Sequence, residues 1–271
     1  MTWGLTGVSV TRGGRLVLDG ATLDVAPGGI VAVVGGDGSG KSSLLAVLAG
    51  LLAPTAGQVG TATRSRLGFL PASSGVYPDL TAAENLRFAA TVHRMGSAAA
   101  DERIRALLAI TGLTAAAGRL GARLSGGMRQ KLGVAMALVH QPDLLILDEP
   151  TTGVDPVSRA DLWWLIAREA ARCAAVVLST TYLDEAERAG EVVVLDHGRT
   201  VLQGAPAGIV AAVPGQIRAA DSRPSGPYAW RRGRSWRVWH PAGGDGEVIR
   251  PDLQDAVVVA ALREAEEAGD E

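Results

Sequence analysis

The chain has 271 residues, 47% of them hydrophobic, which suffices for one larger α/β domain or one domain with a small appendage. Its formal net charge of −2 argues against a general attraction to nucleic acid or to a membrane surface. The single cysteine, Cys173, excludes an internal disulfide and fits a reducing compartment.

Short segments that favour strands open the chain. Residues 8–11, 16–18 and 21–25 are rich in β-forming residues and are separated by glycines, as strands joined by tight turns are. The first ten residues contain no basic region followed by a long apolar run, so we expect no signal peptide. Residues 30–34 form a continuous apolar run that ends in glycines, which is typical of a strand buried on both faces.

Helical periodicity dominates the middle of the chain. Residues 42–52 are periodic and predict a helix, which is interrupted by Gly50 and is too short to cross a bilayer. A second β segment is expected at residues 58–70. Residues 79–133 carry Ala, Leu and Arg at spacings of three and four, which predicts a mostly helical region.

The next part of the chain alternates strands with helices. Residues 144–147, 175–179 and 192–195 are apolar runs that predict buried strands, and residues 156–173 predict a helix with one apolar side. Strands separated by helices imply a mostly parallel sheet.

The composition changes after about residue 214, so we assign residues 215–271 to a small C-terminal extension. The segment SWRVWH, residues 235–240, predicts a strand with Trp236 and Val238 on one side and Arg237 and Trp239 on the other. We expect it to close a small sheet with residues 247–249. Interleaved arginines and tryptophans also occur in single-strand nucleic-acid sites, and contact with a partner subunit is a further alternative.

The segment GGDGSGKSS, residues 35–43, is the strongest functional motif. It fits G-x-x-x-x-G-K-[ST] between a predicted strand and a predicted helix, as a phosphate-binding loop must. Glycines let backbone N–H groups turn toward phosphate oxygens, and the helix N-terminus adds a favourable dipole. A chance lysine in a turn is the alternative, but the chain has only two lysines. The expected phosphate-binding residues are Gly35, Gly36, Asp37, Gly38, Ser39, Gly40, Lys41, Ser42 and Ser43.

The run LLILDEP, residues 144–150, ends in two acids. Asp148 is suited to hold Mg²⁺ together with the Ser42 hydroxyl, and Glu149 is suited to polarise an attacking water. Taken alone, this run is equally compatible with an ordinary strand capped by solvated acids. Beside a phosphate loop it predicts a phosphoryl-transfer site, with Glu149 as the catalytic residue and with Ser42 and Asp148 as metal ligands.

The third motif, LSGGMRQ at residues 124–130, has the features of a helix start. Ser125 is suited as the N-cap, and the glycines after it leave backbone donors exposed. Together, the three motifs resemble the nucleotide-binding subunit of ABC transporters, over roughly residues 3–210. The resemblance implies an α/β fold for residues 1–214. Its parts would be a P-loop NTPase core with a mostly parallel sheet, an antiparallel β subdomain and a helical signature subdomain at about residues 76–135.

The resemblance also implies how such a chain works. Two cassettes close head to tail around two ATP molecules with Mg²⁺. Each ATP lies on one phosphate loop and is completed by Ser125, Gly126 and Gly127 of the other cassette. The segment TTGVDP, residues 151–156, matches the loop whose aspartate, here Asp155, crosses the dimer interface.

Two further segments resemble regions with assigned roles in this family. The segment GVYPDLTAAENL, residues 75–86, resembles the surface that receives the coupling helix of a membrane domain. The segment PDLQDAVVVAAL, residues 251–262, resembles the tail of subfamilies that export drugs, lipids or polysaccharides.

The sequence departs from the family pattern at three positions. Thr181 stands in STTYLDEAE where the family usually has histidine, and Ala72 stands in GFLPA where it usually has glutamine. Threonine is no general base at neutral pH and reaches the γ-phosphate only through a water. Arg12 stands where an aromatic side chain is expected to stack on adenine, and a guanidinium can also lie flat on a purine. The resemblance therefore assigns nucleotide contacts to Arg12 and Thr181, in a weakened site.

These observations predict an ATP-binding subunit that hydrolyses ATP to drive an integral membrane partner, and an exporter is expected. We expect a peripheral protein on the cytoplasmic side of the membrane, a homodimer or heterodimer with a second cassette, and no nucleic-acid partner. Two alternatives stay open. One is a regulatory half that binds ATP without hydrolysing it. The other is a non-transport ABC ATPase, although such proteins usually carry two cassettes or a long coiled-coil insertion.

Overall fold

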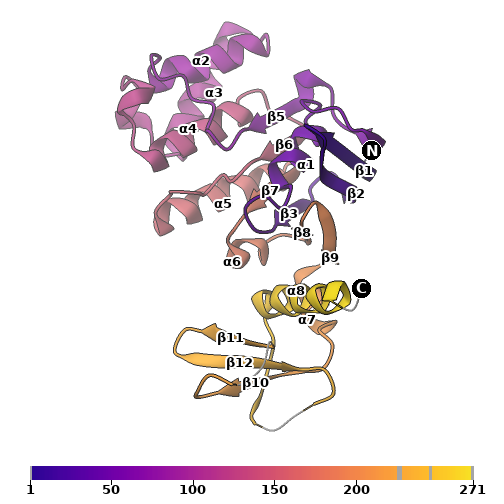
Figure 1. The fold of residues 1–271 in the computed structure, drawn as a ribbon. Coiled ribbons are helices and arrows are strands. Elements are labelled where there is room, and N and C mark those ends of the chain that lie inside the picture. The colour runs from indigo at the N-terminus through magenta and orange to yellow at the C-terminus, as the bar shows by residue number, and fades with distance from the viewer. Residues whose placement is uncertain (1, 225–227, 244–245, 270–271) are drawn as a thin grey trace. The chain divides into compact units, whose positions relative to one another are not determined.

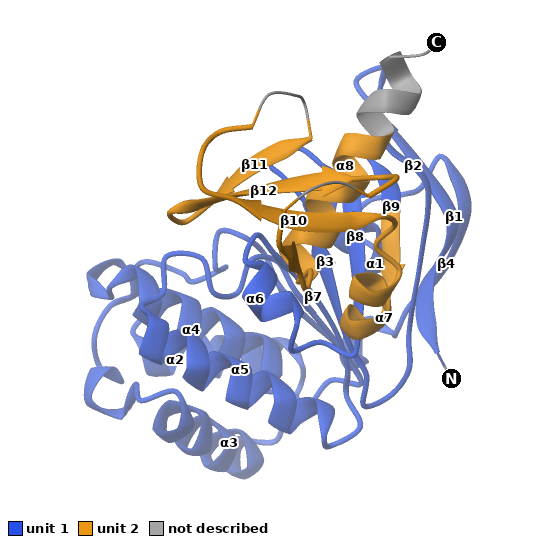
Figure 2. Cartoon of the chain, turned by 90° about the horizontal axis from the view of Figure 1, so that it is seen from below, with its two compact units in different colours: residues 1–200 blue, residues 201–271 orange. Residues whose placement is uncertain are grey.

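The computed structural model describes residues 2–224, 228–243 and 246–269 (Figure 1). The chain divides into two compact units, residues 1–200 and residues 201–271 (Figure 2). This division comes earlier than the boundary near residue 214 that the composition suggested. The physical reason is that helix α7 (Pro206–Ala211) packs against helix α8 (Leu253–Gly269) within the second unit.

Five strands of the first unit belong to a six-stranded sheet, whose sixth strand, β9, continues into the second unit. Its strand order is β5-β6-β7-β3-β8-β9, and the pairs β5–β6, β6–β7, β7–β3 and β3–β8 are parallel. The mostly parallel sheet expected from the alternation of strands and helices is therefore confirmed. The strands are β3 (Ile30–Val34), β5 (Leu67–Leu70), β6 (Leu144–Leu147), β7 (Ala175–Thr180), β8 (Glu191–Asp196) and β9 (Arg199–Gly204).

An antiparallel sheet of three strands, in the order β2-β1-β4, accompanies it. These strands are β1 (Trp3–Arg12), β2 (Arg15–Val25) and β4 (Ala56–Gly60). The register between β1 and β2 is irregular, and β2 is one continuous strand where two short strands, at residues 16–18 and 21–25, were expected. Gly7 and Gly20 have positive φ angles of 58° and 64° in this sheet. The β segment expected at residues 58–70 is divided between β4 and β5, which belong to different sheets, with a 3₁₀ turn at Arg64–Arg66 between them.

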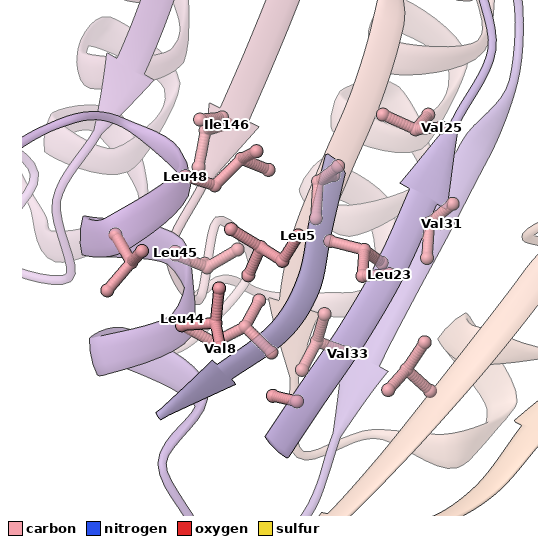
Figure 3. Packing of buried hydrophobic residues seen from close by; sticks show 14 of the residues in the cluster. Leu5, Val8, Leu23, Val25, Val31, Val33, Leu44, Leu45, Leu48 and Ile146 are labelled. Atoms are coloured by element: carbon pink, nitrogen blue, oxygen red, sulfur yellow. The ribbon is translucent and has the colours of Figure 1, made fainter. Parts of the chain in front are cut away.

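The hydrophobic core of the first unit lies between these two sheets and helix α1 (Lys41–Leu48). Figure 3 shows Leu45 of α1 beside Leu5 of β1, and Leu48 beside Ile146 of β6. These four side chains are fully buried, at 0% exposure. Burial of this apolar surface anchors the helix that follows the phosphate loop.

Three helices form a separate group in the first unit (Figure 1). They are α2 (Ala82–Val92), α3 (Ser97–Ile110) and α4 (Gly126–Leu138), with 3₁₀ turns at Thr114–Ala116 and Gly121–Arg123. Helix α2 starts with a capping box, in which the Thr81 hydroxyl accepts from the Glu84 N–H at 3.2 Å and the Glu84 carboxylate accepts from the Thr81 N–H at 2.8 Å. These three helices lie where the helical subdomain was expected, at about residues 76–135, and local capping and periodicity favour them.

Helices α5 (Pro156–Ala170) and α6 (Leu183–Ala186) complete the first unit. Within the part of the chain that the structure describes, no helix combines the length and the apolar character that crossing a bilayer requires.

Two stacked histidines lie where the helical group meets the parallel sheet. The rings of His93, at the end of α2, and His140, after α4, are parallel with centroids 3.4 Å apart. A His140 ring nitrogen is 3.0 Å from the backbone oxygen of Leu67 in β5. Burial, with a smaller contribution from the nearby His93 ring, lowers the pKa of His140 to about 4.

This pair predicts a loss of stability on acidification. Because the pKa of His140 is lower in the folded state than in the unfolded state, His140 becomes protonated in the unfolded state first as the pH falls from about 6.5 toward about 4. The free energy of unfolding should therefore decrease over this range, and this group should add no pH dependence above it. Replacing His140 by Gln, which keeps a donor for Leu67, should flatten the decrease. Urea unfolding at pH 7.5 and pH 5 checks this, and an equal decrease in both proteins would contradict it.

The second unit contains a four-stranded antiparallel sheet in the order β11-β12-β10-β13. Its strands are β10 (Gln216–Ala220), β11 (Ala229–Arg232), β12 (Ser235–His240) and β13 (Val248–Ile249). The strand predicted at SWRVWH is confirmed as β12. It forms the expected small sheet with residues 247–249 through β10, a strand that lacks a clear pattern in the sequence and lies between β12 and β13.

Side-chain contacts explain much of the arginine–tryptophan cluster in this unit. Trp239 is 3% exposed and packs with Ile217 and Val259. Arg237 pairs with Asp255 of α8, and Arg232 pairs with Asp252 at 2.6 Å. Two of the cations that suggested a nucleic-acid surface therefore hold the sheet to its own helix.

Candidate functional site

Parallel strands bring the predicted site residues to one edge of the central sheet. Val34 of β3 is paired with Thr180 of β7, and Leu147 of β6 is paired with Leu70 of β5. Because parallel strands end on the same edge, the residues after these strands meet there. Those residues are the phosphate loop after β3, Ala72 after β5, Asp148 and Glu149 after β6, and Thr181 after β7.

The glycines of the phosphate loop are required by its backbone. Gly35, Gly38 and Gly40 have φ angles of 155°, 79° and 106°, a region that side chains disfavour. A Cβ atom on Gly35 would lie 2.3 Å from the backbone oxygen of Leu195, and one on Gly40 would lie 2.9 Å from that of Val17. A side chain at either position would therefore collide with the backbone of a neighbouring segment, so these two positions require glycine.

Lys41 is held at the mouth of this loop. Its ammonium group donates to the backbone oxygens of Gly35 and Gly36, at 2.9 and 3.1 Å, and the residue is 6% exposed. The same nitrogen lies 3.7 Å from the carboxylate of Glu149. A buried cation held by two carbonyl groups and one carboxylate is a ready partner for phosphate oxygens.

A cleft of about 600 Å³ opens over the loop, which is within the range of small-molecule sites. Eight of the predicted site residues line it, namely Asp37, Gly38, Ser39, Gly40, Lys41, Ser42, Ser43 and Glu149. The structure therefore places the phosphate loop and the predicted catalytic acid in one cleft.

Four further residues line the cleft that sequence reasoning did not identify, namely Arg15, Leu16, Val17 and His197. Arg12, assigned to stack on adenine, is not among the lining residues. Arg12 is the last residue of β1, whereas Arg15, Leu16 and Val17 are the first three residues of β2. A turn that contains two glycines does not by itself predict which residues of the two strands lie side by side. The 49% exposure of Leu16 is unusual for a strand leucine, but only the structure reveals it.

Asp148 and Glu149 are fixed by their backbone and by Ser179. The Ser179 hydroxyl donates to the Asp148 carboxylate at 2.6 Å and accepts from the Glu149 N–H at 2.9 Å. Glu149 has a φ of 51°, a strained value for a side-chain-bearing residue, and Gln130 donates to its backbone oxygen at 2.8 Å. Strain held in place by two hydrogen bonds is typical of a functional position.

The carboxylate of Glu149 also has defined partners. The Thr152 hydroxyl donates to one oxygen at 2.9 Å, and the Lys41 ammonium faces the other at 3.7 Å. The acid is thus poised between the phosphate loop and the segment that follows β6.

These residues fit a phosphate group that carries Mg²⁺. The buried Ser39 hydroxyl, 4% exposed and part of the phosphate loop, has no hydrogen-bond partner among the described residues. Ser179 donates to one oxygen of the buried Asp148 carboxylate, which does not line the cleft, and the oxygen atoms that Asp148 and Ser42 carry are of the kind that a hard cation prefers.

The segments assigned to a second cassette are exposed. Ser125 caps α4 as predicted, its hydroxyl accepting from the Met128 N–H at 3.2 Å. Asp155 caps α5, and the backbone N–H of Ser158, donating to its carboxylate, holds the pKa of Asp155 below its usual range. Ser125, Gly126 and Asp155 are all accessible to solvent, and Gly127 is half-buried.

The two departures from the family pattern lie at the same edge of the sheet. Thr181 directly follows the residue that pairs with Val34 and is exposed, and Ala72 is also exposed. Neither residue lines the cleft.

Comparisons with known proteins agree on one family. The sequence matches the family model described as "ABC transporter" over residues 18–152. It is 39% identical over 199 residues to the "Probable multidrug ABC transporter ATP-binding protein YbhF" of Escherichia coli (strain K12), a match that covers 70% of this chain and 34% of that protein. It therefore spans about a third of the length of that relative. It is also 35% identical over 215 residues to the "Nod factor export ATP-binding protein I" of Paraburkholderia xenovorans (strain LB400), covering 75% of this chain and 71% of that protein.

Solved structures give the same result. The "Structure of ATP binding subunit of ABC transporter" matches with a TM-score of 0.73 and 29% identity, over 78% of this chain and 92% of that chain. A dimeric bacterial ABC transporter cassette, at 23% identity and a TM-score of 0.68, shares the fold over 76% of this chain and 98% of that chain.

Proposed function

This chain belongs to the ABC transporter family, and on that premise we propose that it binds and hydrolyses ATP to drive a partner membrane subunit. The observation that carries the proposal is the shared cleft of about 600 Å³, which Lys41 and Glu149 both line with 3.7 Å between their charged groups. A cation for the phosphates and an acid for the attacking water are the groups that ATP hydrolysis needs in one place.

The roles follow from the positions. The backbone N–H groups of residues 36–43 and the Lys41 ammonium bind the β and γ phosphates, so the carbonyl groups that now hold Lys41 exchange for stronger anionic partners. Mg²⁺, held by Ser42 and Asp148, would neutralise charge on the phosphates. Glu149 leaves its contact with Lys41 once the phosphates occupy the loop, and its carboxylate then polarises a water. Gln130 and Ser179 keep its backbone in place.

The base of the nucleotide has a candidate platform. Leu16 and Val17 line the cleft with the guanidinium-bearing Arg15 beside them, whereas Arg12 lies outside the lining. An exposed leucine offers an apolar face to a purine ring. We therefore assign base contact to this end of β2.

Two partners follow from the exposed segments. Ser125, Gly126, Gly127 and Asp155 would meet a second cassette, so that each ATP is closed between two subunits. Residues 75–86 would receive a membrane subunit, which places the chain peripherally on the cytoplasmic side of a membrane. Export is supported by the names of the relatives and by the sequence of residues 251–262, which from Leu253 onward belong to α8.

A second candidate function is a regulatory half that binds ATP but turns it over slowly in its own site. The observation that favours it is the pair Ala72 and Thr181, whose side chains are exposed and do not line the cleft. In this case Ser125 would serve a partner cassette that carries both the glutamine and the histidine.

The experiment that tests the proposal is isolation of the tagged full chain from detergent-extracted membranes, followed by ATP turnover of the complex. The proposal expects a multi-span membrane protein in the complex and ATP turnover that depends on Mg²⁺. A complex with two copies of this cassette excludes the regulatory half, and one with a second, different cassette supports it. Recovery without a membrane protein, or with ribosomal or DNA-repair partners, would overturn the transport role.

Restoring the family residues should speed hydrolysis. Replacing Thr181 by His should raise single-turnover ATP cleavage by about 100-fold. An aligned acid–base group contributes on the order of 10²–10⁴-fold, and the lower end is expected because the histidine orients the water and does not take its proton alone. Adding Ala72→Gln should raise the rate further, by more than the two single effects predict on a free-energy scale, since neighbouring groups couple. Rapid-quench measurement of the four proteins in the complex checks this. Equal rates would show that other residues have rebuilt the site.

A further inference from the structure

A buried acid outside the nucleotide cleft joins two parts of the site. Glu185 of α6 is 2% exposed. One carboxylate oxygen accepts from the Thr151 hydroxyl at 2.7 Å and from the Thr180 hydroxyl at 3.0 Å. The guanidinium of Arg159 lies 3.6 Å from the other oxygen. Burial of a carboxylate without such partners costs free energy, so these contacts hold Glu185 and its neighbours in fixed positions.

The partners of Glu185 belong to segments with separate roles. Thr151 opens the segment 151–156, which contains Asp155, the residue assigned to the dimer interface. Thr180 is the last residue of β7 and immediately precedes Thr181. Arg159 lies on α5, the helix that Asp155 caps.

Two further contacts tighten this arrangement. The Arg159 guanidinium lies over the ring of Tyr182, 4.6 Å from its centroid, and the Tyr182 N–H donates to the Thr180 hydroxyl at 3.0 Å. The network is therefore closed on both sides of the carboxylate, with α5 and the end of β7 joined through Glu185.

The segment that Glu185 holds also touches the catalytic acid. Thr152, next to Thr151, donates its hydroxyl to the Glu149 carboxylate at 2.9 Å. A shift of Thr151 would therefore move the hydroxyl that holds Glu149. None of Glu185, Thr151 or Arg159 lines the nucleotide cleft. A shift of Thr151 should therefore leave the affinity for the phosphates of ATP unchanged.

We propose that Glu185 is a positioning residue that ties the partner-facing segment 151–156 to the end of β7 and thereby sets the position of Glu149 for hydrolysis. The inference rests on the proposed ATPase function and adds to it a route by which a second cassette, on meeting Asp155, acts on this chain's own catalytic acid. The physical requirement for such coupling is a connected set of contacts, and the hydroxyl–carboxylate bonds supply it.

The test uses the full chain with Glu185→Gln, which keeps the shape of the side chain and removes its charge. Amide hydrogen exchange in residues 150–156 should become several-fold faster, because the Thr151 and Arg159 contacts weaken. The kcat for ATP should fall by about tenfold to a hundredfold, as small misplacements of catalytic groups do, while KM stays within about twofold.

A matched control separates positioning from stability. Glu169 of α5 is equally buried, at 4% exposure, and pairs with Arg103 at 3.6 Å and Arg172 at 3.3 Å, away from the cleft. Glu169→Gln should lower the unfolding temperature and leave kcat and the exchange of residues 150–156 unchanged. Thr151→Val, which removes one hydroxyl, should reproduce the Glu185→Gln result, and the double variant should be no worse than either single variant.

Three outcomes would overturn the proposal. The first is unchanged exchange of residues 150–156 in Glu185→Gln. The second is faster exchange with unchanged kcat, which would leave Glu185 a local structural residue. The third is an equal loss of kcat in Glu169→Gln, which would assign the effect to stability. If the wild-type chain turns over no ATP in any complex, the proposed function fails instead, and the exchange measurement alone then decides whether Glu185 holds the segment.

Discussion

ATP turnover should fall by about 10²–10⁴-fold when Glu149 is replaced by Gln, because the amide cannot take up the proton of the attacking water. Affinity for ATP with Mg²⁺ should be retained or increased, since the change also removes a negative charge that lies 3.7 Å from the phosphate-binding Lys41. Single-turnover cleavage and equilibrium binding, measured on the same preparation, separate the two effects.

The control for this change is Glu187→Gln, an exposed acid just after α6 that the structure places outside the cleft. It should cleave ATP at the wild-type rate. Wild-type turnover in Glu149→Gln would show that another residue activates the water. The strained backbone of Glu149, with its two fixing hydrogen bonds, would then need a different explanation.

The parts of the site that could be predicted are those that one short segment encodes. A phosphate loop needs glycines at positive φ, a lysine and a helix start, and all of these occur within residues 35–43. The acids after β6 were also accessible to prediction, because an apolar run that ends in two carboxylates has few other uses beside such a loop. The caps at Ser125 and Asp155 are equally local, since a cap is defined by the residues within one turn of it.

The parts that could not be predicted depend on contacts between distant segments. The position of Leu16 in the lining of the cleft was not predicted, because the alignment of two strands around a Gly-Gly turn is set by the sheet and not by the turn; the assignment of Arg12 to adenine stays a prediction. Strand β10 was missed because QIRAA has no clear alternation, and it becomes a strand by pairing with β12 and β13. The site network of Glu185 was invisible for the same reason, since its partners come from three separate segments.

The boundary between the units shows a further limit of composition. The change in residue types begins near residue 214, but the second unit starts at residue 201. Residues 202–214 resemble the preceding domain in composition, yet Ile209 is buried within the second unit, where α7 meets α8. The unit to which a segment belongs is decided by the residues it packs against. Composition predicts that unit only when the two units also differ in composition.

Replacing Lys41 by Ala should abolish measurable ATP binding while leaving the fold intact. The ammonium group is the one lysine charge in the cleft, and charge-assisted bonds to phosphate contribute about 1.5–3 kcal/mol each, so loss of two or more predicts at least about a 100-fold weaker complex. The fold should persist because Lys41 bonds to loop carbonyl groups and a carboxylate at the surface of the cleft, and packs no apolar core.

The chain supplies its own matched control, because its only other lysine, Lys131, pairs with Asp161 at 3.2 Å outside the cleft. Titration calorimetry with ATP and Mg²⁺ should show wild-type affinity for Lys131→Ala and none for Lys41→Ala, with equal unfolding temperatures for Lys41→Ala and the wild type in the absence of nucleotide. If Lys41→Ala binds ATP as tightly as the wild type, the cleft over residues 35–43 is not the phosphate site. The contact between Lys41 and Glu149 would then be a structural ion pair, and the nucleotide would have to bind without the cation that the loop holds.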